Sequence, residues 1–402
     1  MALRPAFPWR WEGLSRAYDR VAMTAAGKHQ SSREPGGAAR RPRRSNRLTG
    51  RAGIRDVAAA AGVSITTVSD ALNGKGRLPD TTRRHVREVA ERLGYRPSAA
   101  ARTLRTGKSG LLGLTVTTYG EEPFTFTEFA YFAEMARSAT SAALARGYAL
   151  VILPAASRHS AFDVWSSVAL DGTVVIDPSD QDPVVTDLVR SGLPVVSDGR
   201  PSGNLKVAAW VDNDHEVAVS GLLDHLAEGG ARRIGLLTGT GTDAYTRLST
   251  TAYLDWCARA GQDPVYECYP AHDPCAGAVA ADRLLARPDR PDAVYGLYDP
   301  NGTDLLAAAR RYHLRVPEDL LLVCCSESNV YSTTEPPVTT LSLKPRRIGN
   351  TVIELLIDAI EGVAPERPVD RVMPTDLVVR TSSRRPRGGS RSVIAPRPPV
   401  GE

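Results

Sequence analysis

The segment AGVSITTVSDALNG, residues 61–74, places short hydroxylated and apolar side chains at helical spacing. Ser and Thr hydroxyls donate hydrogen bonds to phosphate oxygens, and short side chains let a helix approach a DNA backbone and its major groove. The same segment suits a tight corner between two helices, with Gly62 in the turn, Val63 packed inward and Ser64 as the N-cap of the second helix. Val63 and Val68 have the spacing of a hydrophobic staple. The sequence predicts a helical corner, with or without a role in DNA contact.

A second group of polar residues follows apolar runs later in the chain. Ligands of doubly wound folds bind beyond the carboxyl ends of the strands, where such residues lie. Their side chains could contact a small molecule there, or could form structural hydrogen bonds within the protein. The polar residues at these positions are Thr118, Asp177, Asp198, Asp299 and Ser326.

The motifs of common catalytic sites are absent from the sequence. There is no G-x-S-x-G, H-E-x-x-H or Walker sequence, and GTGTDAYTR at 239–247 lacks the third glycine of a dinucleotide fingerprint. The cysteines are odd in number and form no C-x-x-C, so we expect buried thiols rather than disulfides or a zinc site. They are Cys257, Cys268, Cys275, Cys324 and Cys325. We expect no enzyme, no cofactor and no metal.

Three short helices fit residues 54–93 and would position the first group. Asp80 is a fair N-cap for the third helix, and Gly94 is a fair terminator. Small residues at 97–98 open a further helical turn before glycines at 107–110 loosen the chain. The apolar positions of the third helix repeat with helical spacing: Val86, Val89, Ala90 and Leu93.

After residue 110, apolar runs alternate with helical windows at 215–228 and 346–361. Near-continuous apolar strands separated by helices predict parallel sheets that are covered on both faces. About 270 residues exceed one small sheet, so we expect two α/β lobes. The candidate strands are 111–118, 148–155, 172–178, 193–199, 233–239, 293–299 and 320–327.

The 402 residues are 42% hydrophobic and 24% charged, which is typical of a globular chain with two or three domains. No apolar run is long enough to cross a membrane, and the first thirty residues lack a secretory signal, so we expect a cytoplasmic protein. The net charge is +5, and residues 1–53 hold twelve Lys plus Arg against three Asp plus Glu. This arm is expected to be disordered and either to touch DNA non-specifically or to reflect a start codon placed too far upstream. The tail, residues 381–402, is expected to be a solvated, disordered end.

From Ile54 to about Arg380 the sequence resembles the lactose/galactose-repressor (LacI/GalR) family of bacterial transcription regulators. The most specific part starts at IRDVAAAAGVS and ends at RTLRTGKS, residues 54–109, which matches the family's DNA-binding head and hinge without gaps. PDAVYGLYD (291–299), VPEDLLLV (316–323) and PPVTTL (336–341) match core landmarks in order. The resemblance implies an all-α helix-turn-helix head (54–97), a hinge helix and linker (98–110), and a two-lobed periplasmic-binding-protein-like core (111–380).

The resemblance implies that the helix at 65–72 lies in the major groove, with Ile65, Thr66 and Asp70 facing base edges. Asp70 departs from the arginine that is frequent in the family. An aspartate cannot recognise guanine as arginine does, so it accepts a hydrogen bond from cytosine N4 or stays away from DNA. Positions near phosphates are Ser64, Ser69, Asn73, Arg77 and Thr82. The other DNA-binding residues expected are Ile54, Thr67, Tyr95 and, in the hinge, Ser98, Ala101 and Leu104.

In the family the hinge forms a helix only on operator DNA, and a leucine at the position of Leu104 wedges into the minor groove and kinks it. Unstacking the base pairs costs a few kcal/mol, and the additional contacts between the bent duplex and the protein offset that cost. Ala101 would allow the close approach. The alternative is an ordinary linker helix, with Leu104 packed on the core.

Family effector pockets lie between the lobes and use polar side chains at strand ends. Tyr298-Asp299 stands where relatives commonly have Asn-Asp, and Ser326-Glu327 where they commonly have an Asp. Arg247 is the candidate for an arginine that clamps sugar hydroxyls in relatives, although it lies two residues early by strict count. These departures argue against a plain sugar. The expected effector contacts are Thr118, Asp177, Arg247, Tyr298, Asp299, Ser326 and Glu327, each with a structural role as its alternative.

The sequence therefore predicts a regulator, most simply a repressor, that binds a near-palindromic operator as a homodimer under control of a small-molecule effector. The effector is expected to be a sugar or a related metabolite, and no membrane partner is expected. Two other classes remain open: a constitutive DNA-binding regulator whose cleft has lost its ligand, and a solute-binding protein. The solute binder would need an export signal and would have no use for residues 54–108.

Overall fold

The structure, a computed structural model, describes residues 52–96, 103, 107–116, 129–153, 165, 167–201, 205–271, 273, 275–363 and 369–385. Residues 1–51 of the predicted basic arm, residues 386–402 of the tail, Thr118 and the hinge residues Ser98, Ala101 and Leu104 lie outside the described residues. The start of the tail differs from the expected disordered end: Ser382 is fully buried, donates to the Leu322 carbonyl and accepts from the Thr339 amide, so the core continues past residue 380. Internal contacts divide the chain into two units, Met1–Arg96 and Pro97–Glu402. Each unit is described by itself.

The first unit contains the three predicted helices, α2 (Ile54–Ala61), α3 (Ile65–Asn73) and α4 (Asp80–Arg92). The Ser64 hydroxyl accepts a hydrogen bond from the Thr67 amide at 3.0 Å, which confirms Ser64 as the N-cap of α3. Gly62 adopts φ 65° after α2, as a tight helix end requires. The shared core consists of Val57, Ala58, Ala61, Val68, Ala71, Val86, Val89 and Ala90.

Two expectations for the third helix are corrected. Asp80 is the first residue of α4, and its N-cap is Pro79, which makes no side-chain capping bond. Leu93 is 36% exposed although it continues the apolar repeat, because α4 ends at Arg92 and the chain turns away. Gly94 follows with φ 61°, so it terminates the helix as expected.

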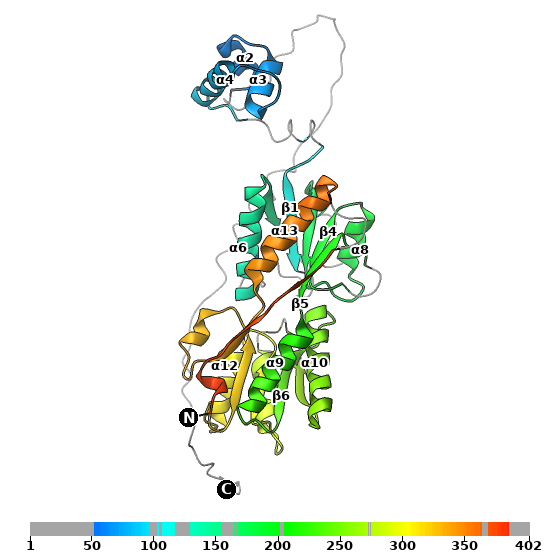
Figure 1. The fold of residues 1–402 in the computed structure, drawn as a ribbon, viewed down its shortest axis with the longest axis vertical. Helices are drawn as coiled ribbons and strands as arrows, with labels where there is room; N and C mark the ends of the chain where they lie inside the picture. Colours follow the sequence, from blue (N-terminus) through cyan, green and yellow to red (C-terminus); the bar gives the residue numbers. More distant parts are fainter. Residues whose placement is uncertain are drawn as a thin grey trace, which may run out of the picture. The chain divides into compact units, whose positions relative to one another are not determined.

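The second unit contains two six-stranded sheets (Figure 1). Along the first sheet the order is β11 (Val369–Met373), β5 (Ala209–Asn213), β4 (Val195–Asp198), β3 (Gly172–Ile176), β1 (Leu111–Val116) and β2 (Ala149–Ile152), all parallel. Along the second it is β12 (Asp376–Val378), β10 (Thr339–Ser342), β9 (Leu321–Cys325), β8 (Ala293–Gly296), β6 (Ile234–Gly239) and β7 (Val265–Tyr269). Only β12 pairs antiparallel. The structure confirms two doubly wound lobes.

Helices cover both faces of each sheet, which explains why the central strands are apolar throughout. On the first sheet, α6 (Ala130–Ala145) packs beside α13 (Pro345–Glu361), and α8 (Pro183–Arg190) covers the opposite face (Figure 1). A Cβ at Gly349 would lie 2.2 Å from the Ser138 hydroxyl, so the glycine permits the close contact of α6 with α13. Around the second sheet, α9 (His215–Glu228) packs on α10 (Ala244–Ala260), and α11 (Ala276–Ala286) packs on α12 (Asn301–Arg311).

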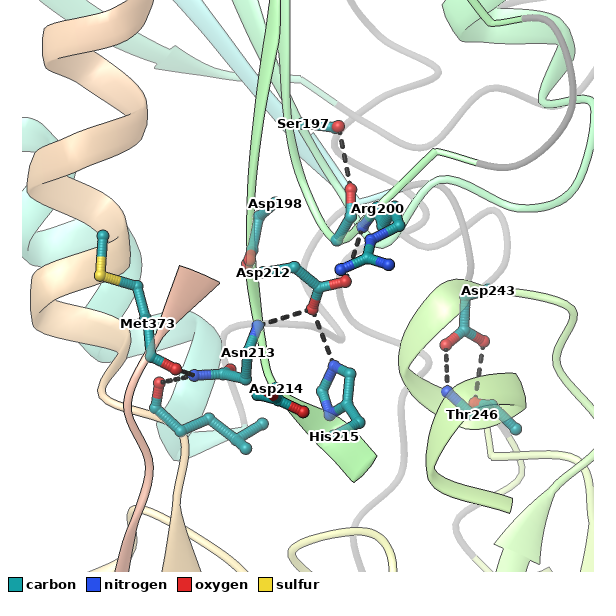
Figure 2. A network of polar contacts seen from close by, with 12 residues as sticks. Ser197, Asp198, Arg200, Asp212, Asn213, Asp214, His215, Asp243, Thr246 and Met373 are labelled. Atoms are coloured by element: carbon teal, nitrogen blue, oxygen red, sulfur yellow. Dashed lines mark hydrogen bonds and ion pairs between the residues drawn. The ribbon is translucent and has the colours of Figure 1, made fainter. Parts of the chain in front are cut away.

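The chain passes between the two sheets three times: from β5 to α9, from β10 to α13, and from β11 to β12. The amide of Asn213, at the end of β5, joins all three passages. Its Nδ2 donates to the carbonyl oxygens of Leu343 and Met373, both at 3.1 Å (Figure 2). Asn213 is 4% exposed, so these bonds fix the connection between the lobes without competition from water.

All seven expected strands form, and all except β1, whose apolar run continues beyond the described residues, are shorter than their runs. Five strands were not predicted from the sequence: β5, β7 and the three strands after residue 338. The last strand of each sheet carries a weak apolar signal. Charged residues interrupt β11, VDRVM, and β12 has only three residues, DLV. Such edge strands depend on pairing with a neighbour that is distant in sequence.

Candidate functional site: an acidic cleft and an exposed helix

A cavity lies where the carboxyl ends of the two sheets meet in the second unit. Its interior volume is about 60 Å³, and it is partly open to solvent. Five of the seven residues expected from the sequence line it: Asp177, Tyr298, Asp299, Ser326 and Glu327. Asp198, noted in the sequence as a strand-end residue but not carried into the effector set, also lines it. Lining residues that were not predicted include Tyr131, Asp212, His215 and Tyr245.

Asp212 is the best-bonded carboxylate of the cleft (Figure 2). Its Oδ1 accepts from the Asn213 amide at 2.8 Å and contacts His215 Nε2 at 2.7 Å. Its Oδ2 accepts from the Arg200 amide at 2.9 Å. Because Asp212 is 3% exposed and fully bonded, it holds the end of β5 and the start of α9 in place. The apolar run AAWV directly before Asp212 was the signal for this strand end.

Asp198 ends β4 and lines the cavity with a side chain that is 4% exposed. Its Oδ2 accepts a hydrogen bond from the Tyr131 hydroxyl at 2.8 Å. Burial, with repulsion from Asp212, raises the pKa of Asp198 to about 7, while the Tyr131 bond opposes the rise. Burial also raises the pKa of Asp177 well above its usual value, and the carboxylates of Asp243, Asp198 and Asp212 add to the shift.

Two more carboxylates come from the second lobe. The Ser326 hydroxyl donates to Asp299 Oδ1, and burial raises the pKa of Asp299. Glu327 accepts from the Ser342 hydroxyl at 2.9 Å and from the Leu343 amide at 2.8 Å, and burial raises its pKa as well. The cavity is therefore bordered by carboxyl groups from both lobes.

Aromatic rings form the apolar walls. The His215 and Tyr245 rings meet edge-on with centroids 5.3 Å apart, and Tyr245 meets Tyr298 at 6.0 Å. The Tyr298 hydroxyl lies 2.6 Å from Thr246 Oγ1, which donates to Asp243 at 2.9 Å (Figure 2). These bonds fix the ring of Tyr298 in the cavity wall. On the first lobe the rings of Phe129, Tyr131 and Phe132 line the cavity.

Arg247, expected to clamp a ligand, is exposed and does not line the cavity, because it follows Thr246 on the outward side of α10. Within the described ranges, no Lys or Arg side chain lines the cavity. Nor does any group of three His, Cys, Asp or Glu side chains in those ranges have an arrangement that could hold a metal ion. Among the helices that the structure describes, none is both long and apolar enough to span a membrane.

In the first unit, the hydroxylated turn at the start of α3 is open to solvent. Ile65 is 45% exposed, which is unusual for an isoleucine, and Ser64 and Thr66 beside it are exposed too. Of the other expected DNA contacts, Asn73 and Arg77 are exposed, and Thr67, Ser69, Asp70 and Thr82 are half-buried. Ile54 and Tyr95 pack partly against the core of the head.

Asp70 lies beside the turn that follows α3. A Cβ on Gly76 would lie 3.1 Å from Asp70 Oδ2, so the carboxylate reaches over the backbone of that turn. Gly76 has φ 74°, and its carbonyl accepts a hydrogen bond from Arg83 Nη2 at 2.6 Å. Asp70 therefore contacts the turn between α3 and α4 from a half-buried position.

Both units resemble known protein families. Residues 53–98 match the family model "Bacterial regulatory proteins, lacI family", and residues 223–383 match "Periplasmic binding protein-like domain". The transcriptional regulator CelR of Thermobifida fusca is 30% identical over 332 residues, which are 81% of this chain and 96% of CelR. The repressor PurR of Photobacterium profundum is 28% identical over 346 residues, covering 82% of this chain and 98% of PurR.

Solved structures show the same fold. A lac repressor dimer bound to operator and the anti-inducer ONPF aligns with a TM-score of 0.72 at 22% identity, over 83% of this chain and all of that one. A CelR–cellobiose complex aligns with a TM-score of 0.62 at 28% identity, over the same shares. The helix-turn-helix head, the two-lobed core and these relatives together establish that the chain belongs to the LacI family of bacterial regulatory proteins and is a transcriptional regulator rather than an enzyme.

Proposed function

We propose that this regulator is a repressor that binds a near-palindromic operator as a homodimer, with α3 of each head in a major groove. The observation that carries the proposal is Ile65, an apolar side chain exposed at the first turn of α3 and flanked by the hydroxyls of Ser64 and Thr66. An exposed apolar group there suits a thymine methyl, and the hydroxyls suit phosphates and base edges.

The cleft between the lobes is proposed to hold the small-molecule effector. Its support is the cavity at the strand ends and the similarity to CelR, whose complex contains cellobiose. An effector that binds the open and closed arrangements of the lobes unequally shifts their populations. Through the hinge at 98–110, that shift would favour or disfavour insertion of Leu104 into the minor groove.

In vitro selection from random duplexes with the full chain tests the DNA-binding proposal. We expect a two-fold symmetric site, and a protein that binds it as a dimer. The Ile65→Ala variant should lose specific binding and keep salt-dependent binding to random DNA, because its phosphate contacts are unchanged. Recovery of no preferred sequence, or a monomer on the DNA, would refute the proposal.

Asp70 and Leu104 provide finer tests of the same proposal. Asp70→Arg should change the selected half-site, and an unchanged site would mean that Asp70 serves only the turn beside Gly76. Leu104→Ala should weaken specific binding far more than non-specific binding, whereas equal losses would exclude the wedge. Operator affinity measured with and without candidate ligands tests the alternative of a constitutive regulator. If no ligand changes that affinity, the protein is a constitutive regulator without an effector.

A further inference from the structure

We propose that the effector of this cleft is an organic cation, a molecule that presents an ammonium group to the carboxylates, rather than a neutral sugar. The proposal rests on the proposed function, since it names the chemistry of the ligand for the same cavity. It follows from three features of the lining: its charge, its unused acceptor atoms and its aromatic walls.

The lining is strongly one-sided in charge. Five carboxyl groups line the cavity and come from the ends of five strands: Asp177, Asp198, Asp212, Asp299 and Glu327. No Lys or Arg side chain belongs to the described lining. Lys344, outside it, interacts electrostatically with Glu327 but is paired with Asp376, and the His215 ring nitrogen Nε2 is already 2.7 Å from Asp212. Carboxylates gathered in a poorly solvated place repel one another unless protons or a cation neutralise them. Arg200 does not compensate them, since its guanidinium stacks on Trp210 at 4.7 Å.

Two carboxyl oxygens remain available to a ligand. No described residue donates a hydrogen bond to Asp198 Oδ1 or to Asp299 Oδ2, although the other oxygen of each group is bonded. Asp198 is 4% exposed, so water reaches its free oxygen only through the cavity. Sugar hydroxyls could satisfy these acceptors, but they carry no charge, so the carboxyl groups with raised pKa values would have to stay partly protonated. An ammonium group supplies both the donors and the charge.

The aromatic walls distinguish an organic cation from a metal ion. Rings of Phe129, Tyr131, Phe132, Tyr245 and Tyr298 line the cavity. Aromatic faces attract ammonium groups and pack on the carbon atoms that carry them. A divalent metal would instead need several oxygen or nitrogen ligands converging on one point, and no group of three suitable side chains in the described residues does so.

Proton release gives the proposal a second readout. Asp198 has a pKa of about 7, with Tyr131 hydrogen-bonded to it and with Asp177 and Asp212 close enough to interact with it electrostatically. A bound cation favours the ionised carboxylate, so binding should release protons below about pH 8. The affinity should rise as the pH increases from 6 to 8. A neutral ligand would show no such rise from this group.

The experiment uses the full chain and pairs of probes that differ in charge. Isothermal titration would compare glucosamine with glucose and N-acetylglucosamine, 1,5-diaminopentane with 1,5-pentanediol, and choline with 3,3-dimethylbutanol. We expect at least one amine to bind about tenfold or more tightly than its neutral partner. Its binding enthalpy should also change with the ionisation enthalpy of the buffer, which shows that protons are released on binding. Asp299→Asn should reduce that preference, whereas Asp214→Asn, which changes a helix cap outside the cavity lining, should keep it.

Each outcome is decisive. If every amine fails to bind, or if a neutral partner binds as tightly at pH 8, the charge inference is wrong. The operator selection separates this failure from that of the proposed function. A chain that selects a symmetric operator and responds to a neutral ligand keeps its proposed function and loses only the cationic effector.

Discussion

Asp212 gives the sharpest prediction for stability. Its carboxylate is 3% exposed and accepts hydrogen bonds from the amides of Arg200 and Asn213 and from His215 Nε2. Asp212→Asn keeps the shape but replaces one acceptor oxygen by an NH₂ group. If the remaining oxygen serves Asn213 and His215, the NH₂ group faces the Arg200 N–H, so one bond is lost and two donors are left buried. A hydrogen bond to a charged group contributes about 1.5–3 kcal/mol, and an unsatisfied buried donor costs about 1–3 kcal/mol.

We expect Asp212→Asn to lower the free energy of unfolding of the core by about 3 kcal/mol, which corresponds to a fall in Tm of roughly 6–12 °C. The loss should be measured near pH 5.5. There Asp198, with its pKa of about 7, is protonated, so removal of the Asp212 charge brings little relief from repulsion. At pH 8 that relief should offset part of the loss.

Differential scanning calorimetry of the full chain is the assay, because the head and the core can unfold in separate transitions. Asp214→Asn is the matched control. Asp214 caps α9 through a bond to the Val217 amide at 3.0 Å, and Asn caps a helix about as well as Asp. If Asp212→Asn and Asp214→Asn unfold within about 1 °C of each other, the reasoning on buried acceptors is refuted.

Three further outcomes are expected. Ser64→Ala should destabilise the head by about 1 kcal/mol because the Thr67 amide loses its acceptor, while Ser64→Asn should not; equal melting of both variants by circular dichroism would exclude the cap. Gly349→Ala should cost about 1–3 kcal/mol, since its Cβ would lie 2.2 Å from the Ser138 hydroxyl, and an unchanged calorimetric Tm would contradict that overlap. For Asp198, a pKa raised to about 7 from 3.8 means that the native state binds more protons between about pH 4 and 7, so stability falls as pH rises through that window. Asp198→Asn should remove this fall. Urea titrations would measure the free energy of unfolding at pH 5 and 8, and the same difference between the two pH values in the variant and the unchanged protein would contradict the raised pKa.

The head could be predicted from the sequence almost completely. Its three helices, the Ser64 cap and the terminator Gly94 follow from signals within a few residues of one another. The errors there are small and local. Asp80 lies one residue inside the helix that it was expected to cap, and Leu93 lies just beyond the last turn that could bury it.

The cleft was predicted only in part. Strand ends such as Asp177 and Asp299 were found because a polar residue follows a long apolar run, and both line the cavity. Tyr131 and Tyr245 were missed because they lie on helices, where an aromatic residue looks like any other core position. Arg247 was carried over from the family by position, and it is exposed outside the cavity lining.

By itself, the sequence determined the helical head and the central strands, because caps, turns and apolar periodicity act over short separations along the chain. The class of regulator came from the resemblance of residues 54–109 to the LacI/GalR family. Only the tertiary structure decided which strands and helices belong to each lobe and which side chains line the cleft. Asn213 bonds to Leu343 and Met373, which lie 130 and 160 residues away, and Tyr131 bonds to Asp198 from another element. Such contacts depend on how twelve strands are ordered in two sheets, and no local pattern of residues encodes that order.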